Sequence, residues 1–111
     1  MSPVQPALAI ERAGDGRVRV AGALGFANAG LALPRAAEFE AGRSATEVDL
    51  SGLTDADSAT LAVLLAWSAR ATQRSARLRY SNMPEGLRAL ARLAEVEPLL
   101  GLAAGTQVRA R

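Results

Sequence analysis

The segment that most constrains the fold runs from Ser58 to about Gln73, because it contains neither glycine nor proline. A run with strand character, residues 46–50, precedes it, and turn-forming residues fill positions 51–57 between the two. We therefore predict a strand, a loop and a long helix in that order. The positions expected on one face of this helix are spaced as i, i+3, i+4, i+7 and i+11: Leu61, Leu64, Leu65, Ser68 and Thr72.

The first part of the chain predicts a β-hairpin. Residues 7–12 and 17–21 are short runs in which apolar and polar side chains alternate, as in a half-buried strand. Gly14, Asp15 and Gly16 lie between them, and glycine and aspartate are typical of tight hairpin turns.

Three further elements complete the predicted order. Residues 31–41 form a helix that Gly42 ends, residues 76–80 form a strand, and Pro84 opens a last helix over 84–95. Because proline is tolerated in the first turn of a helix, Pro34 places the expected start of the first helix nearer residue 33 than residue 29. Strands that alternate with helices pair in parallel through right-handed crossovers. We therefore predict an α/β fold: an N-terminal hairpin followed by alternating strands and helices, with about four strands in a mixed sheet and the helices mainly on one face.

A chain of 111 residues is long enough for a single domain with one core. We expect residues 1–111 to form that domain, with its core over about 7–100 and flexible ends at 1–6 and 103–111. No apolar run is long enough to cross a bilayer, and the first residues lack the pattern of a signal peptide. We therefore expect a cytoplasmic protein that does not insert directly into a membrane.

Composition excludes much chemistry. The chain has no histidine and no cysteine, and all thirteen of its basic residues are arginine, which is not a base at neutral pH. A pair of carboxylates could still supply an acid and a base, but nothing places such a pair in a pocket. We therefore predict that the protein is not an enzyme and uses no cofactor.

Three kinds of ligand are also disfavoured. Asp49, Asp55 and Asp57 are near one another in sequence, but their spacing fits no calcium loop, so we predict no metal site. The glycines have no nucleotide-binding spacing. A net charge of +2 and few aromatic residues do not indicate nucleic acid.

The Asp57–Ser58 step is the first candidate site, because there a loop that follows a strand meets a helix N-terminus. We expect Ser58 to be the N-cap, its hydroxyl accepting from the amide of residue 60 or 61, with Asp57 adding favourable negative charge. Capping alone would explain both residues. The alternative is that an exposed hydroxyl at a helix start is a partner contact or a phosphorylation point.

The second candidate lies on the same helix. Thr60, Val63 and Trp67 fall roughly opposite the leucine face, so the single tryptophan is expected either on an exposed protein-binding stripe or beneath a neighbouring helix. Both interpretations stay open at this point. Asn28, which precedes the first helix, is a candidate helix cap.

The order of elements and the Asp57–Ser58 step together resemble the STAS domain family over about residues 7–100. Residues 48–53 look like the third strand of that family and its exit, and Asp57–Ser58 matches the Asp-Ser/Thr step that serine kinases phosphorylate in anti-sigma factor antagonists. Residues 61–67 and 80–93 are similar to the MlaB-like branch of the family. Two features depart from the antagonists: Thr60 replaces their usual glycine, and no clear last strand and helix follow.

The resemblance implies a STAS-like, non-enzymatic cytoplasmic subunit that docks on the ATPase subunit (MlaF-like) of a phospholipid-transport ABC complex, which maintains outer-membrane lipid asymmetry. It would be peripheral at the cytoplasmic face of the inner membrane, held there through that partner. The alternative is an anti-sigma factor antagonist regulated by phosphorylation of Ser58. The residues expected to contact the partner are Asn28, Asp57, Ser58, Ala59, Thr60, Val63 and Trp67.

Overall fold

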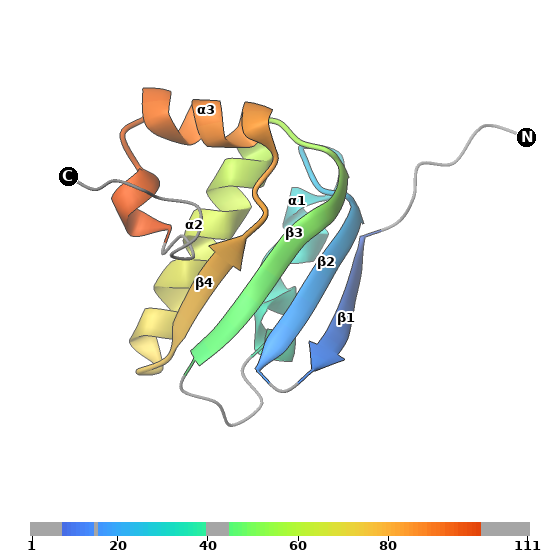
Figure 1. The fold of residues 1–111 in the computed structure, drawn as a ribbon, viewed down its shortest axis with the longest axis vertical. Coiled ribbons are helices and arrows are strands. Elements are labelled where there is room, and N and C mark those ends of the chain that lie inside the picture. The colour runs from blue at the N-terminus through green and yellow to red at the C-terminus, as the bar shows by residue number, and fades with distance from the viewer. Residues whose placement is uncertain (1–7, 15, 40–44, 101–111) are drawn as a thin grey trace, which may run out of the picture.

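The computed structural model describes residues 8–14, 16–39 and 45–100, and these form a sheet covered by helices (Figure 1). The ends predicted to be flexible, 1–6 and 103–111, lie outside the described residues. One four-stranded sheet has the order β1-β2-β3-β4. Its strands are β1 (Ala9–Gly14), β2 (Arg17–Ala23), β3 (Ala45–Asp55) and β4 (Arg77–Ser81).

The predicted hairpin is confirmed, with β1 and β2 antiparallel and Ile10 opposite Val20. β2 pairs with β3 in parallel, and β3 pairs with β4 in parallel. The sheet is therefore mixed, and each parallel pair is joined by a connection that contains a helix.

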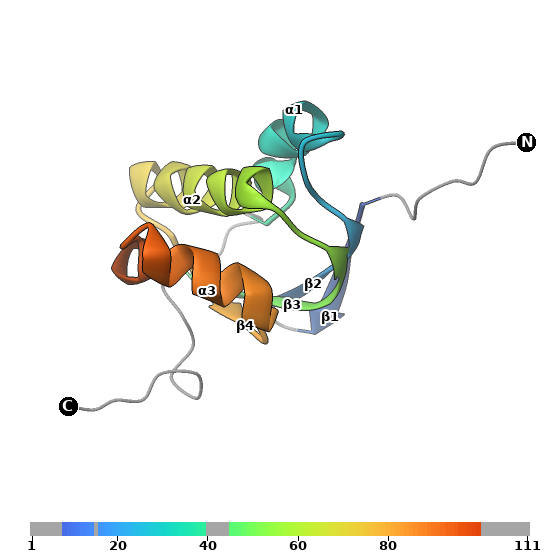
Figure 2. The same ribbon diagram turned by 90° about the horizontal axis from the view of Figure 1, so that it is seen from above.

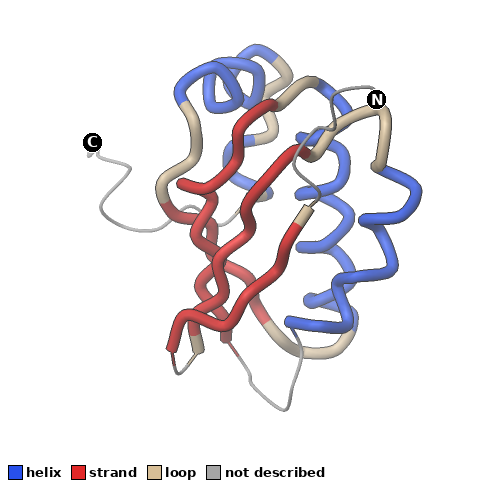
Figure 3. The backbone as a smooth tube through the Cα atoms, turned by 90° about the vertical axis from the view of Figure 1, so that its right-hand side faces the viewer, coloured by secondary structure: helices blue, strands red, loops and turns tan. Residues whose placement is uncertain are grey.

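The α-helices of the described residues, α1, α2 and α3, all lie on the same face of the sheet (Figures 2 and 3). α1 (Ala29–Ala32) continues into a 3-10 helix, η1 (Leu33–Phe39), and α2 (Ser58–Gln73) is the long central helix. α3 (Glu85–Leu93) follows β4, and a short 3-10 turn, η2 (Glu97–Leu99), comes after it. The predicted α/β fold class, with its opening hairpin and one-sided helices, is confirmed.

The first helix differs from the prediction of one continuous helix over 31–41. It begins at Ala29, so the start expected nearer residue 33 is wrong, and it tightens into a 3-10 helix at Leu33. The cause is Pro34, which has no amide N–H and cannot make the hydrogen bond that an α-helix needs there. Residues 40 and 41 of the predicted helix lie outside the described residues.

The loop predicted over 51–57 is also wrong, because β3 continues to Asp55. Pairing with β2 extends that far, with Ala21 opposite Gly52 and Ala23 opposite Asp55, and two shifts of register accommodate the extra residues. A Cβ atom at residue 52 would lie 2.7 Å from the Cβ of Ala21, so glycine permits this close approach of the strands. Only Ala56 and Asp57 remain between β3 and α2.

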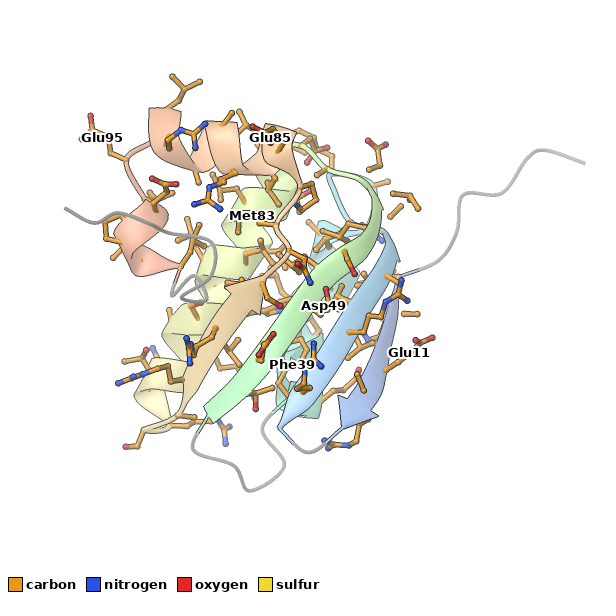
Figure 4. The ribbon with its side chains drawn as sticks, in the orientation of Figure 1. Glu11, Phe39, Asp49, Met83, Glu85 and Glu95 are labelled. Atoms are coloured by element: carbon orange, nitrogen blue, oxygen red, sulfur yellow. The ribbon has the colours of Figure 1, made fainter. Side chains whose placement is uncertain are left out.

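The core lies between the sheet and α2, which η1 and α3 flank. The opposite face of the sheet is polar: Arg17 pairs with Glu47 at 3.7 Å, and Arg19 pairs with Glu11 at 4.0 Å. Figure 4 shows Glu11 and Asp49 on the strands of this charged face. Exposed ion pairs contribute little to stability, so burial on the helical side holds the fold together.

Candidate functional site

The start of α2 is capped by Asp57, not by Ser58 as the sequence predicted. Asp57 has an extended backbone, and its Oδ1 accepts from the amides of Ala59 at 2.8 Å and Thr60 at 3.1 Å. The Oγ1 of Thr60 accepts in return from the Asp57 amide at 2.9 Å. This is a capping box with threonine at its third position. Ser58 is the first helical residue, and its side chain is exposed.

Thr60 also joins two loops that are far apart in the sequence. Its side chain is fully buried, and its hydroxyl donates to the carbonyl of Leu24 in the loop between β2 and α1. The amide of Phe26 in that loop donates to Oδ2 of Asp57 at 3.3 Å. The β2–α1 loop and the start of α2 are thus held as one unit.

Asn28 stabilises the same loop from within. Its side chain accepts from the amide of Gly25 at 3.0 Å and donates to the carbonyl of Ala23 at 2.8 Å. It occupies the N-cap position of α1, but its side chain makes no hydrogen bond to that helix. The predicted capping role of the Asn28 side chain is therefore wrong, because the loop takes both of its polar groups.

Gly25 lets the two loops approach one another. A Cβ atom there would lie 2.7 Å from Oδ2 of Asp57, closer than nonbonded atoms can be. A larger residue would therefore separate the β2–α1 loop from the Asp57 carboxylate.

The Asp57 carboxylate is ionised at neutral pH. Burial raises the pKa of Asp57, but hydrogen bonds from the amides of Phe26, Thr60 and Ala59 together lower it more, and the pKa lies below its ordinary value. The carboxylate therefore brings a fixed negative charge to the positive end of the α2 dipole.

A recess of about 250 Å³ lies between the two loops, lined by residues 23–28 and 55–57. Phe26 at its border is 76% exposed, and Leu31 on the following helix is 77% exposed. Large apolar side chains this exposed are typical of interaction surfaces when they gather beside polar groups. Phe26 was not among the predicted contact residues, although an aromatic residue next to Gly25 in the loop between β2 and α1 was a usable signal.

Four of the residues predicted to contact a partner have buried side chains instead. Trp67 is 1% exposed, its Nε1 donates to the carbonyl of Ala32 at 3.1 Å, and its ring packs edge-on against Phe39 with centroids 4.9 Å apart. The prediction of an exposed stripe is therefore wrong, and the interpretation that a neighbouring helix covers Trp67 is correct. The four buried residues are Ala59, Thr60, Val63 and Trp67.

Asp49, the aspartate on β3 that precedes this region, is held by hydrogen bonds of its own. Asp49 accepts from the side chain of Asn82 at 3.0 Å and from the amide of Ser51 at 2.9 Å. Across residues 8–14, 16–39 and 45–100, no three or more acidic side chains gather closely enough to hold a metal ion together. Within the same ranges, no helix is both long and apolar enough to span a bilayer.

A mixed sheet covered on one face, with a capped and exposed helix start directly after the third strand, defines a small α/β domain of the STAS class. The family described as "Mlab, STAS domain" matches residues 8–101. The chain therefore belongs to the MlaB-like STAS domain family, whose members are generally non-enzymatic. No curated protein matches the chain closely enough to count as a relative.

Proposed function

We propose that the protein is a non-enzymatic subunit that binds and supports the ATPase of a phospholipid-transport ABC complex, through the start of α2. The observation that carries the proposal is the contrast within one short segment: Asp57 and Thr60 are fixed by hydrogen bonds, while Ser58 between them is exposed. A surface that is rigid before binding loses little conformational entropy when a partner docks.

The chemistry of Ser58 favours contact over catalysis. A nucleophilic serine needs a general base, and the chain has no histidine or lysine to serve as one. The adjacent Asp57 carboxylate is a poor base, because the amides that bind it hold its pKa below the ordinary value. Ser58 is therefore proposed as a hydrogen-bonding contact at the interface.

The second candidate, an anti-sigma factor antagonist, rests on the exposure of Ser58, which makes its hydroxyl accessible to a kinase. Two observations weigh against it. The helix amides of Ala59 and Thr60, which could have held a phosphate, already donate to Asp57. A phosphate at Ser58 would also stand beside the Asp57 carboxylate, so like charges would repel.

The location follows from the proposed partner. With its ATPase at the cytoplasmic face of the inner membrane, the protein would be peripheral there and would contribute to outer-membrane lipid asymmetry through the complex. No contact between this chain and lipid is needed.

Affinity purification from the native cell tests the proposal. We expect the tagged wild-type chain to recover an ABC ATPase, and Ser58→Arg, which puts a long cation at the helix start, to lose it. Thr72→Arg is the matched control, because Thr72 is exposed near the other end of the same helix. Recovery of a kinase with phosphate on Ser58, and of no ATPase, would favour the antagonist instead.

A further inference from the structure

A second recess lies on the other side of the short connection between β3 and α2. It measures about 330 Å³ and is lined by the end of β3 and by the start of α3. Asp55 and Ala56 line both this recess and the one beside Phe26. The connection is therefore a ridge between two recesses, and α3 borders the same surface as the start of α2 (Figure 1).

The two recesses differ in polarity, but the charged residues that line them are all acidic. The α3-side recess has mainly apolar walls, which include Leu53, Pro84 and Leu90. Among the described residues that line either recess, the charged ones are Asp55 and Asp57, both acidic. The chain as a whole has a net charge of +2, so this surface is acidic although the molecule carries a small excess of positive charge.

Two further features add to the pattern. Glu85, the first residue of α3, is exposed next to Pro84 and Gly86 of the α3-side recess (Figure 4). On the other side of the ridge, the largely exposed ring of Phe26 borders the recess that contains Asp55. A carboxylate and an aromatic ring that line the same recess suit a cation with an apolar stem, such as the side chain of arginine or lysine.

We propose that the ATPase segment that docks here is cationic and apolar, and that it crosses the Asp55–Ala56 ridge. A basic side chain of that segment lies against Asp55 and Phe26, while apolar side chains enter the recess beside α3. This inference rests on the proposed function and extends its interface from the start of α2 to α3. Complementary charge sets orientation and association rate, and apolar burial contributes the affinity.

Gly86 offers a clean test of the α3-side recess. A Cβ atom at residue 86 meets nothing within 4 Å, and replacing glycine within a helix does not destabilise it. Gly86 lines the recess one helical turn before Leu90, so Gly86→Leu should keep the fold, place a bulky side chain at the recess and weaken binding to the purified ATPase by about tenfold or more. Ala69→Leu, at an exposed position of α2, is the matched control and should bind as the wild type does.

Asp55→Arg tests the charge on the ridge. Its affinity for the ATPase should fall by about tenfold or more, and the wild-type affinity should fall as salt rises. Glu95→Arg, the same change of charge at an exposed residue after α3, should have little effect (Figure 4).

The outcomes separate the two proposals. Loss of affinity in both Asp55→Arg and Gly86→Leu, with both controls unaffected, supports the cationic, two-recess interface. If the wild type binds the ATPase and either test variant binds equally well, this inference is overturned and the proposed function stands. If the wild-type chain itself does not bind the ATPase, both are overturned.

Discussion

The start and the middle of α2 were both expected to contact a partner, and they are built in opposite ways. At the start, the buried hydroxyl of Thr60 and the carboxylate of Asp57 satisfy backbone groups of two loops, and Ser58 stays exposed. In the middle, Trp67 and Val63 are buried. The start of α2 therefore offers a surface that can bind a partner, whereas the middle of α2 belongs to the core that supports this surface.

Substitutions in these parts of α2 are therefore expected to have different effects on folding and on binding. A change in the middle of α2 removes apolar contacts and should act on folding. A change to the capping network should act on folding less strongly, because each hydrogen bond contributes less than a large buried side chain. A change to Ser58 should leave folding almost intact and act on binding.

The largest effect is expected for Trp67→Ala. Truncating a large aromatic residue in a core costs about 3–5 kcal/mol, and here the hydrogen bond to the carbonyl of Ala32 is lost as well. Urea denaturation followed by circular dichroism measures the loss, or shows that the variant does not fold. Trp67→Phe, which keeps an aromatic ring against Phe39, should lose less. A loss below about 1 kcal/mol for Trp67→Ala would contradict the buried position.

Thr60→Val should have an intermediate effect. Valine keeps the shape but leaves the carbonyl of Leu24 and the amide of Asp57 without the hydroxyl, which costs about 1–3 kcal/mol when such groups are buried. Thr60→Ser retains the hydroxyl and should recover most of the loss in the same denaturation experiment. Equal stabilities of the valine variant and the wild type would show that the hydroxyl does not join the loops.

The effect of Asp57→Ala should be smaller and should depend on pH. Loss of an N-cap costs about 1 kcal/mol at neutral pH. Because folding lowers the pKa of Asp57, its contribution is present above the unfolded pKa of about 4 and is lost as pH falls through the lower, folded value. The stability gap between wild type and variant should therefore narrow as pH falls below about 4. A gap that is constant from neutral pH to acid would contradict the capping role.

The sequence predicted the parts of the structure that depend on local pattern. The absence of glycine and proline gave α2 its correct bounds, and the Gly14–Gly16 turn placed the hairpin. The Asp57–Ser58 step lies where it was expected, although the capping residue is Asp57. A carboxylate and a hydroxyl can both cap a helix, and only the backbone conformation of each residue decides between them.

What the sequence did not predict depends on contacts between distant segments. A helical wheel shows one apolar face of α2, but η1 and α3 flank the helix, so Trp67 is covered by residues more than thirty positions away in the chain, such as Ala32. The continuation of β3 to Asp55 depends on two shifts of register against β2. The contact between Phe26 and Asp57 was not predicted for the same reason, because it joins two loops that are distant in the sequence.

The most direct test of the account is a calorimetric titration of the purified ATPase with the wild type and with Ser58→Arg, alongside the thermal unfolding of both chains. Ser58 is exposed, and a cation at the positive end of a helix dipole costs at most about 1 kcal/mol, so the replacement should change the free energy of unfolding by no more than that. We expect the wild type to bind, and Ser58→Arg to unfold at nearly the same temperature without measurable binding. Equal affinities of the two chains would contradict the claim that the start of α2 is the docking surface.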